Sequence, residues 1–447
     1  MQKKLFYLFN FLMLAGFVAA LAVDYHKDWR KYQAEYYRRT AGVLEAKAMQ
    51  SSDPAEAAKL KAQARKMRSM PIQIRQIIAK DLGRVDRCIT CHVGMDEFVN
   101  PTLTTAFKDQ PFAGHPDLSG IVKNHSFQKF GCTVCHAGQG LAVSVEAAHG
   151  KTENWEKPLL REPLLQASCA KCHGNFETLH GAEIAAKGKH IFETHGCLGC
   201  HSIHGKGGVI SVDLGNIADK PLERIALYNL SLIKGPDGKP LPRRDWKLPA
   251  WIEAHLTNVP MDFVPNDPYA KYNKEPIAPS GMPDFTQELT RDDADAVTAY
   301  LLSLTEEEQI PSRYYVPGPP QKEPRFANAV EHGKFVFNRY GCAGCHGLGG
   351  TKGRRNYNAL GPGQGDMSLD MDKGREPTLV DTLGTYTRDE LRAKIQNGVP
   401  SSQIQKFNPD GPTPPLYMPT WKEKIKGQEL EDLVTYLMSI AKKQEEF

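Results

Sequence analysis

One five-residue pattern, Cys-x-x-Cys-His, occurs five times in the 447 residues of this chain and constrains it more than any other feature. The five copies are CITCH (Cys88, Cys91, His92), CTVCH (Cys132, Cys135, His136), CAKCH (Cys169, Cys172, His173), CLGCH (Cys197, Cys200, His201) and CAGCH (Cys342, Cys345, His346). Together they contain all ten cysteines. Every cysteine therefore belongs to one repeated kind of site.

This pattern is the attachment signature of c-type haem. The two thiols add to haem vinyl groups as thioethers, and the adjacent histidine ligates the iron as its proximal ligand. A zinc site would not need a histidine directly after every second cysteine. A disulfide framework would vary its spacings, and a redox dithiol normally occurs once. We therefore predict five covalently bound c-type haems, with His92, His136, His173, His201 and His346 as proximal ligands.

The N-terminus carries an apolar run, residues 5–23, after Lys3 and Lys4. At about 1.5 Å per residue, this run is long enough to cross a bilayer as a helix. A cleaved signal peptide is the alternative, because Ala20-Leu21-Ala22 resembles a cleavage site. The run is longer than the core of a signal peptide, however, and aromatic residues typical of a membrane interface follow it: Tyr25, Trp29, Tyr32, Tyr36 and Tyr37. We predict a retained transmembrane anchor over residues 1–23.

Haem attachment takes place outside the cytoplasm, so the body is expected in the periplasm and the anchor in the inner (cytoplasmic) membrane. The positive-inside rule disagrees, because five basic residues follow the apolar run: Lys27, Arg30, Lys31, Arg38 and Arg39. We give precedence to haem attachment. The net charge of +4, from 56 basic and 52 acidic residues, argues against a nucleic-acid partner.

The rest of the chain is expected to be mainly α-helical. Residues 24–86 predict a helical stalk, broken near residues 51–54 and at Pro71, and residues 87–180 a loop-rich trihaem region. In so short a stretch the porphyrins must supply the apolar interior, so neighbouring haems are expected to nearly touch. Residues 181–305 and 326–447 form two similar modules, joined by a proline-rich linker over residues 306–325.

The two modules share an internal repeat. Residues 188–201 align without gaps with residues 333–346, and each copy continues through loops to a Met-Pro-x-aromatic turn and an amphipathic helix. Thr290 and Asp293 predict a capping box at the start of the first of these helices. The predicted apolar faces are Val297, Tyr300, Leu301 and Leu304, and Leu430, Leu433, Val434, Leu437 and Ile440. This order of elements resembles the class I cytochrome c fold over both modules.

The resemblance implies that Met282 and Met418 are the distal ligands of the fourth and fifth haems, with Met261 as the alternative for the fourth. The first three motifs have no Met-Pro element, but His115, His125 and His149 lie near them. We predict these three as distal ligands, without assigning each to a haem. His180 and His190 also lie nearby, but beyond the compact region that holds the chosen three. His195 and His204 flank the fourth motif too closely to ligate its iron from the far side and are interpreted as surface residues, with a second-shell donor or a ligand of a neighbouring haem as alternatives. His26, His255 and His332 are interpreted as ordinary polar residues.

With all five irons six-coordinate, the chain should transfer electrons and catalyse no reaction alone. Met/His ligation raises a haem's potential relative to two histidines, so electrons should run from the trihaem region to the two modules. Residues 24–175, with the segments DWRKYQ, VDRCITCHVG and HPDLSGIVKNHSFQKFGCTVCHAGQG, also resemble membrane-anchored multihaem cytochrome c subunits of bacterial quinol-oxidising complexes. That resemblance supports the three distal histidines. It implies partners (cytochrome b, a Rieske-type protein or other integral membrane subunits) and a soluble periplasmic acceptor such as a small cytochrome c.

Three other interpretations remain open. A pentahaem nitrite reductase usually carries lysine in place of one motif histidine, whereas all five motifs here end in histidine. An electron-feeding subunit of a terminal oxidase or anaerobic reductase would be distinguished only by its companion proteins. A passive structural or haem-storage protein would show no ordered gradient of potentials.

Overall fold

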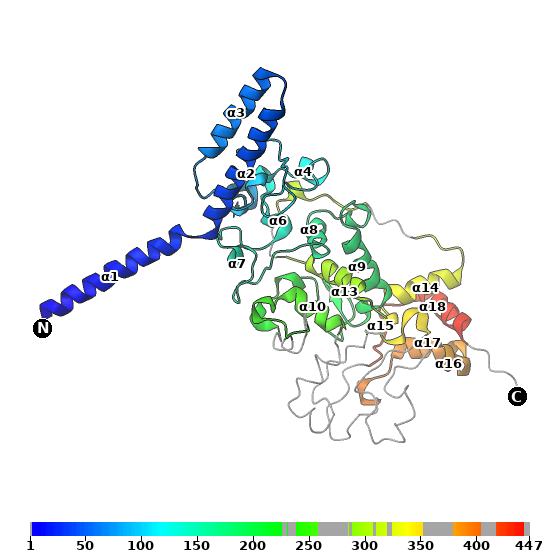
Figure 1. Ribbon diagram of the computed structural model, residues 1–447. Helices are drawn as coiled ribbons and strands as arrows, with labels where there is room; N and C mark the ends of the chain where they lie inside the picture. The colour runs from blue at the N-terminus through cyan, green and yellow to red at the C-terminus, as the bar shows by residue number, and fades with distance from the viewer. Residues whose placement is uncertain are drawn as a thin grey trace. The chain divides into compact units, whose positions relative to one another are not determined.

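The computed structural model describes residues 2–225, 230, 238–257, 285, 288–306, 310–319, 324–351, 379–403 and 417–441. The chain divides into two compact units, Met1–Leu160 and Arg161–Phe447. In the described residues helices and short 3-10 turns predominate, and the strands are only two or three residues long (Figure 1). This confirms the predicted, mainly α-helical fold class.

The first unit begins with an isolated apolar helix. Its elements are α1 (Gln2–Tyr25), α2 (Asp28–Gln50), α3 (Pro54–Arg68), β1 (Ile77–Ala79), η1 (Lys80–Leu82), β2 (Arg84–Asp86), η2 (Cys88–Thr90), η3 (Val93–Met95), α4 (Ile121–Asn124), α5 (Phe127–Phe130), α6 (Thr133–His136) and α7 (Val145–Ala148). Among the described residues, one helical stretch, starting at Lys3, is long and apolar enough to cross a membrane, with a mean hydropathy of 2.1 and no buried residues in its apolar window. A single-pass anchor is consistent with this surface, because water-soluble proteins rarely expose so large an apolar patch.

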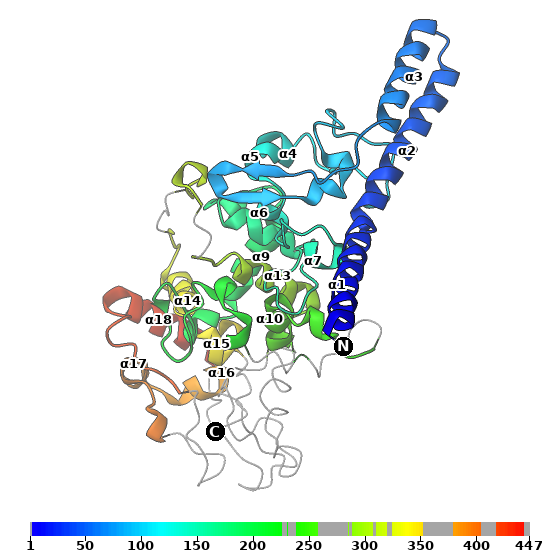
Figure 2. The ribbon, with the colours of Figure 1, turned by 90° about the vertical axis from the view of Figure 1, so that its left-hand side faces the viewer.

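Helices α2 and α3 form a hairpin, side by side in both views (Figures 1 and 2). The predicted break is confirmed: α2 ends at Gln50, and the side chain of Asp53 caps α3 by accepting from the Ala55 backbone N–H at 2.9 Å. The aromatic residues of α2, however, are not an interface belt. Trp29, Tyr36 and Tyr37 are each 3 % exposed, and the two tyrosines pack in a core cluster of the same unit. Their expected membrane position was wrong, because an amphipathic helix that faces a protein core shows the same pattern.

The helical prediction for residues 24–86 fails over its last part. After α3 ends at Arg68, residues 69–76 form neither helix nor strand, and β1 pairs with β2 in an antiparallel hairpin with Ile77 opposite Asp86. The turn between the strands ends at Gly83, which has a φ of 61°. Because β2 ends directly before the first motif, this hairpin determines where the first two motifs lie.

The second unit contains the last three motifs. Its elements are η4 (Leu164–Gln166), α8 (Ala167–Ala170), η5 (Phe176–Thr178), α9 (Glu183–Thr194), η6 (Cys197–Gly199), β3 (Ser202–Ile203), β4 (Lys206–Gly207), η7 (Ile217–Asp219), η8 (Leu222–Arg224), η10 (Arg243–Asp245), α10 (Leu248–Thr257), α13 (Arg291–Leu302), η11 (Ser312–Tyr314), α14 (Ala329–Arg339), α15 (Ala343–His346), η12 (Leu348–Gly350), α16 (Leu379–Thr382), η13 (Leu383–Thr385), α17 (Arg388–Asn397), η14 (Ser401–Gln403) and α18 (Gly427–Ile440). Strands β3 and β4 pair antiparallel. The third motif, on α8, packs against α13 and therefore against the first module.

Each module is built on one crossed helix pair, α9 with α13 and α14 with α18. The predicted capping box of α13 is confirmed, with Thr290 and Asp293 bonded to each other's backbone. At each crossing a glycine lets the helices approach closely. A Cβ on Gly188 would lie 1.8 Å from the carbonyl oxygen of Ala296, and one on Gly333 would lie 2.0 Å from that of Asp432.

Gly188→Val and Gly333→Val should each destabilise one module by about 3 kcal/mol, because the added side chain forces the helices apart. Thermal unfolding of the purified protein measures the loss. Gly42→Val in α2 is the matched control, since that helical glycine has no neighbouring atom within 4 Å of a built Cβ. Equal losses in all three variants would mean that helix propensity, and not the crossings, is responsible.

Candidate metal centres

All five motifs fold into the same single turn. In each, the backbone N–H of the histidine donates to the carbonyl of the first cysteine. The pairs are His92–Cys88 (2.9 Å), His136–Cys132 (3.0 Å), His173–Cys169 (2.9 Å), His201–Cys197 (2.9 Å) and His346–Cys342 (3.0 Å). One turn brings residues i, i+3 and i+4 to one side of the backbone, so both thiols and the imidazole face the same space. This is the arrangement that covalent haem attachment requires.

The motif cysteines are not arranged as the alternatives require. None of the ten, all of which the structure describes, is joined in a disulfide. The described residues include no group of three or more His, Cys, Asp or Glu side chains that would hold a metal ion. Burial raises the pKa of Cys91 to about 11 and that of Cys342 to about 12.

The first unit pairs two motif histidines with two of the predicted distal histidines. The ring centroids of His92 and His149 are 6.4 Å apart, and those of His136 and His115 are 6.3 Å apart. Two imidazoles that ligate one iron from opposite sides hold their centroids roughly 6 Å apart, because each metal–nitrogen bond is about 2.0 Å long. The geometry therefore fits a haem iron between His92 and His149 and another between His136 and His115, a pairing that the sequence left open.

His92 and His115 have lowered pKa values, which favour the neutral imidazole that a metal binds. Burial, reinforced by His149, lowers the pKa of His92 to about 4. Burial and, secondarily, His136 lower the pKa of His115. A metal binds the unprotonated ring nitrogen, so a lowered pKa removes the competition from protons at neutral pH.

The first two motifs also lie against each other. The pKa of Cys132 is raised, first by a hydrogen bond to the Cys88 thiol and second by burial. Asp86, which ends β2 and is 1 % exposed, accepts from the backbone N–H groups of Cys132 (2.5 Å) and Thr133 (2.9 Å). The Thr133 hydroxyl donates to the same carboxylate at 2.7 Å. Asp86, a buried side chain on the strand that precedes the first motif, thus fixes the start of the second motif.

The third motif is hydrogen-bonded to the segment that was predicted as a linker. The backbone N–H of Gly174 donates to Val316 at 2.7 Å, and that of Val316 donates to Cys172 at 2.8 Å. This part of the predicted linker is therefore not a free spacer.

His125, the third predicted distal histidine, belongs to the first unit, where its Nδ1 contacts the Ile121 carbonyl at 2.9 Å. Its ligand role stays a prediction.

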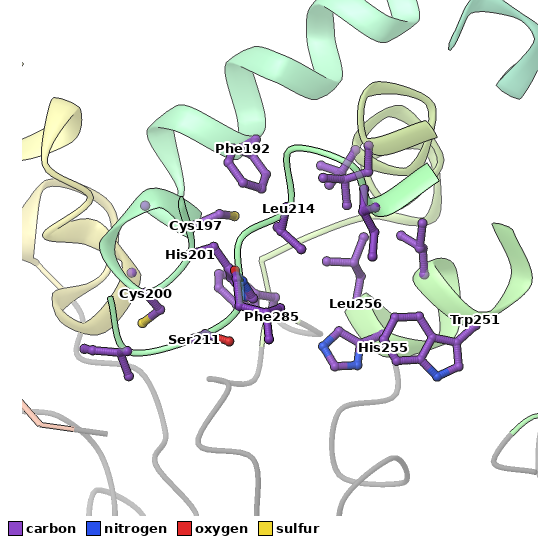
Figure 3. Close-up of a pocket in the computed structure, with 18 of the residues that line it drawn as sticks. Phe192, Cys197, Cys200, His201, Ser211, Leu214, Trp251, His255, Leu256 and Phe285 are labelled. Atoms are coloured by element: carbon purple, nitrogen blue, oxygen red, sulfur yellow. The ribbon is translucent and has the colours of Figure 1, made fainter. Parts of the chain in front are cut away.

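The fourth motif opens onto an apolar cavity of about 180 Å³ lined by Cys197, Cys200 and His201 (Figure 3). Nδ1 of His201 lies 2.9 Å from the carbonyl oxygen of Val212, a contact that orients the ring. Burial is the main cause of the lowered pKa of His201. The predicted distal ligand Met282 and its alternative Met261 lie outside the described residues.

The same cavity contains a histidine that the sequence analysis treated as an ordinary polar residue. His255, on α10, lines the cavity and stacks on Trp251, with ring centroids 4.8 Å apart (Figure 3). It also contributes, after burial, to the lowered pKa of His201.

The fifth motif opens onto a cavity of about 400 Å³ that brings its predicted ligands together. Cys342, Cys345 and His346 line it, and so does Met418. The Met418 carbonyl accepts from the Val399 N–H at 2.8 Å, which fixes the Met-Pro turn beside the cavity. The predicted histidine and methionine are thus present around one apolar space large enough to fit a porphyrin edge.

The comparisons with known proteins concern this second unit. The sequence model of the family Cytochrome c matches residues 185–305 and 330–441, which together make up more than half of the chain. The matched ranges contain the fourth and fifth motifs and follow the two modules seen in the structure. No curated protein and no solved structure matched the chain.

Proposed function

Because the chain belongs to the cytochrome c family, we propose that it is the membrane-anchored, multihaem electron-transfer subunit of a quinol-oxidising complex. In this proposal it carries five covalently bound c-type haems. It accepts electrons from a partner that contains cytochrome b and a Rieske-type protein or other integral membrane subunits. It delivers them to a soluble periplasmic acceptor such as a small cytochrome c.

The observation that carries this proposal is the difference between two kinds of ligand set. The first unit offers pairs of imidazoles, His92 with His149 and His136 with His115. The fifth cavity offers one imidazole and the thioether of Met418. Bound haem iron supplies reversible one-electron chemistry, and Met/His ligation raises its potential above that of a bis-histidine site. This order favours electron flow from the first unit toward the modules.

The side chains around the fifth cavity support a role in electron transfer. Phe337, Trp421 and Leu433 are buried residues of its wall and give the cavity an apolar lining. With His346 and Met418 both holding the iron of a bound haem, no position would be left for a substrate. The same reasoning applies to the two histidine pairs of the first unit.

We assign α1 to the inner membrane, with the rest of the chain on the periplasmic side. The exposed apolar surface of α1 supports the anchor. The attachment motifs support the side, because c-type haem is attached outside the cytoplasm. Electrons would then enter near the membrane and leave toward a soluble acceptor.

Purification of the detergent-solubilised complex, with identification of its companion subunits, tests the proposal. A cytochrome b among them, together with quinol-dependent reduction of this chain, is the expected result. A copper–haem oxidase core would instead support the electron-feeding alternative. A redox titration in which all haems titrate without separation into groups would favour a storage protein and overturn the proposal.

Met418→His should lower the midpoint potential of one haem by on the order of 0.1 V, because axial ligands set haem potentials over a range of about 0.8 V. A redox titration of the purified chain measures the shift. The matched control is Met438→Leu, a methionine that packs on the same core but does not line the cavity. If neither variant changes the titration, Met418 is not an iron ligand.

A further inference from the structure

Four glycines of the fourth and fifth motifs bring the two modules into direct backbone contact. A Cβ built on Gly196 would lie 2.0 Å from the backbone nitrogen of Gly344, and one on Gly344 would lie 2.4 Å from the carbonyl oxygen of Gly196. A Cβ on Gly199 would lie 2.2 Å from the carbonyl oxygen of Gly341, and one on Gly341 would lie 2.1 Å from the nitrogen of Gly199. Side chains at these positions would therefore force the modules apart.

The contact is reciprocal. In the internal repeat, Gly196 aligns with Gly341 and Gly199 aligns with Gly344. Gly196 contacts Gly344, and Gly199 contacts Gly341, so each glycine contacts the non-equivalent glycine of the other module. This exchange is the pattern of a two-fold-related interface. The two motifs thus meet face to face through equivalent surfaces. Lys424 adds a polar contact between the modules, because its Nζ donates to the Gly207 carbonyl at 2.7 Å.

Haem attachment alone does not explain Gly199 and Gly344. Both occupy the residue before the second cysteine, and the other three motifs carry Thr90, Val134 and Lys171 there. Neither glycine has a left-handed φ, so the backbone does not require glycine either. What the two positions share is the close approach of the other module.

Two glycines of this contact also line the cavities of the two motifs. Gly344, of the fifth motif, lines the cavity of the fourth motif. Gly199, of the fourth motif, lines the cavity of the fifth. Cys200 and Cys345 directly follow these glycines. Because these cysteines would bond porphyrin vinyl groups, the thioether edges of both bound haems would lie at this contact.

We propose that the contact formed by Gly196, Gly199, Gly341 and Gly344 holds the fourth and fifth haems edge to edge, so that electrons pass directly between the two modules. This inference rests on the proposed electron-transfer function and specifies the pathway in its last part. One electron moves in each step, from reduced iron at one motif to oxidised iron at the other. The glycines act by positioning, since they bind neither iron.

The pairing has an electrostatic consequence. Oxidation of one iron adds a positive charge beside the other in an environment of low dielectric constant, where charges interact more strongly than in water. Oxidation of the first therefore makes oxidation of the second less favourable. The two haems of the modules should show coupled midpoint potentials even if their ligands are identical.

Gly344→Val tests the proposal, because Val134 shows that the motif accepts valine at this position. The variant should keep its haem, as measured by peptide mass spectrometry. The rate of electron exchange between the modules, measured after photochemical injection of one electron, should fall by roughly tenfold or more, since reactivity falls steeply when held groups are displaced. Pulsed paramagnetic resonance should report a longer distance between the two ferric irons.

Lys171→Val is the matched control, because it places the same side chain at the same position of the third motif. It should change neither the rate nor the distance. An unchanged rate and distance in Gly344→Val would overturn the proposal. Because these measurements use the purified chain alone, they stand even if the physiological partner is not a quinol-oxidising complex.

Discussion

An Asp86→Ala variant should destabilise the first unit by on the order of 3 kcal/mol, because it leaves three buried donors without their acceptor. These donors are the backbone N–H groups of Cys132 and Thr133 and the Thr133 hydroxyl. With the start of the second motif released, we expect incomplete haem attachment at Cys132 and Cys135. Thermal unfolding and peptide mass spectrometry measure the two effects.

Two further variants separate this role from a general loss of carboxylates. Asp86→Asn keeps one oxygen acceptor and should lose less stability than alanine. Asp53→Ala removes an exposed cap of α3, which costs about 1 kcal/mol and should leave haem attachment unchanged. Complete haem attachment with unchanged stability in Asp86→Ala would show that the carboxylate does not organise the second motif.

His149→Ala and His115→Ala should each convert one six-coordinate iron to a high-spin iron. In the first variant His92 loses its facing imidazole, and in the second His136 does. The double variant should contain two such irons. Electron paramagnetic resonance of the oxidised protein counts them, and it should resolve separate histidine–histidine and histidine–methionine classes in the unchanged protein.

His125→Ala provides the comparison for this pair of variants. It should leave both histidine pairs low-spin, because His125 contacts the Ile121 carbonyl and belongs to neither pair. A double His115→Ala, His149→Ala variant with only one high-spin iron would contradict the pairing. A uniform bis-histidine spectrum in the unchanged protein would contradict the methionine ligands.

Short sequence patterns predicted the structural features that depend on interactions between neighbouring residues. The spacing of Cys342, Cys345 and His346 fits a single turn, and the structure forms that turn in every motif. The capping box at Thr290 and the break before Pro54 were also readable, because both depend on residues within one helical turn. The repeat of residues 188–201 indicated two modules, and the family match covers both.

Contacts between residues that are distant in the sequence could not be predicted from it. The pairing of His92 with His149 depends on the fold of the intervening loops, and no periodicity encodes it. The buried position of Tyr36 and Tyr37 was misread because a protein core and a membrane interface select the same aromatic residues on a helix. His255 escaped notice because a lone histidine on a helix carries no signal until the opposite wall is known.

The hydrogen bonds between Val316 and the third motif have a mechanical consequence. A chain whose last haem module is joined by a long flexible linker could move that module between an electron donor and an electron acceptor. Here Val316, near the middle of the connecting segment, is hydrogen-bonded to Cys172 and Gly174. Only residues 317–325 of the predicted linker lie between this attachment and the last module, which limits how far that module could move.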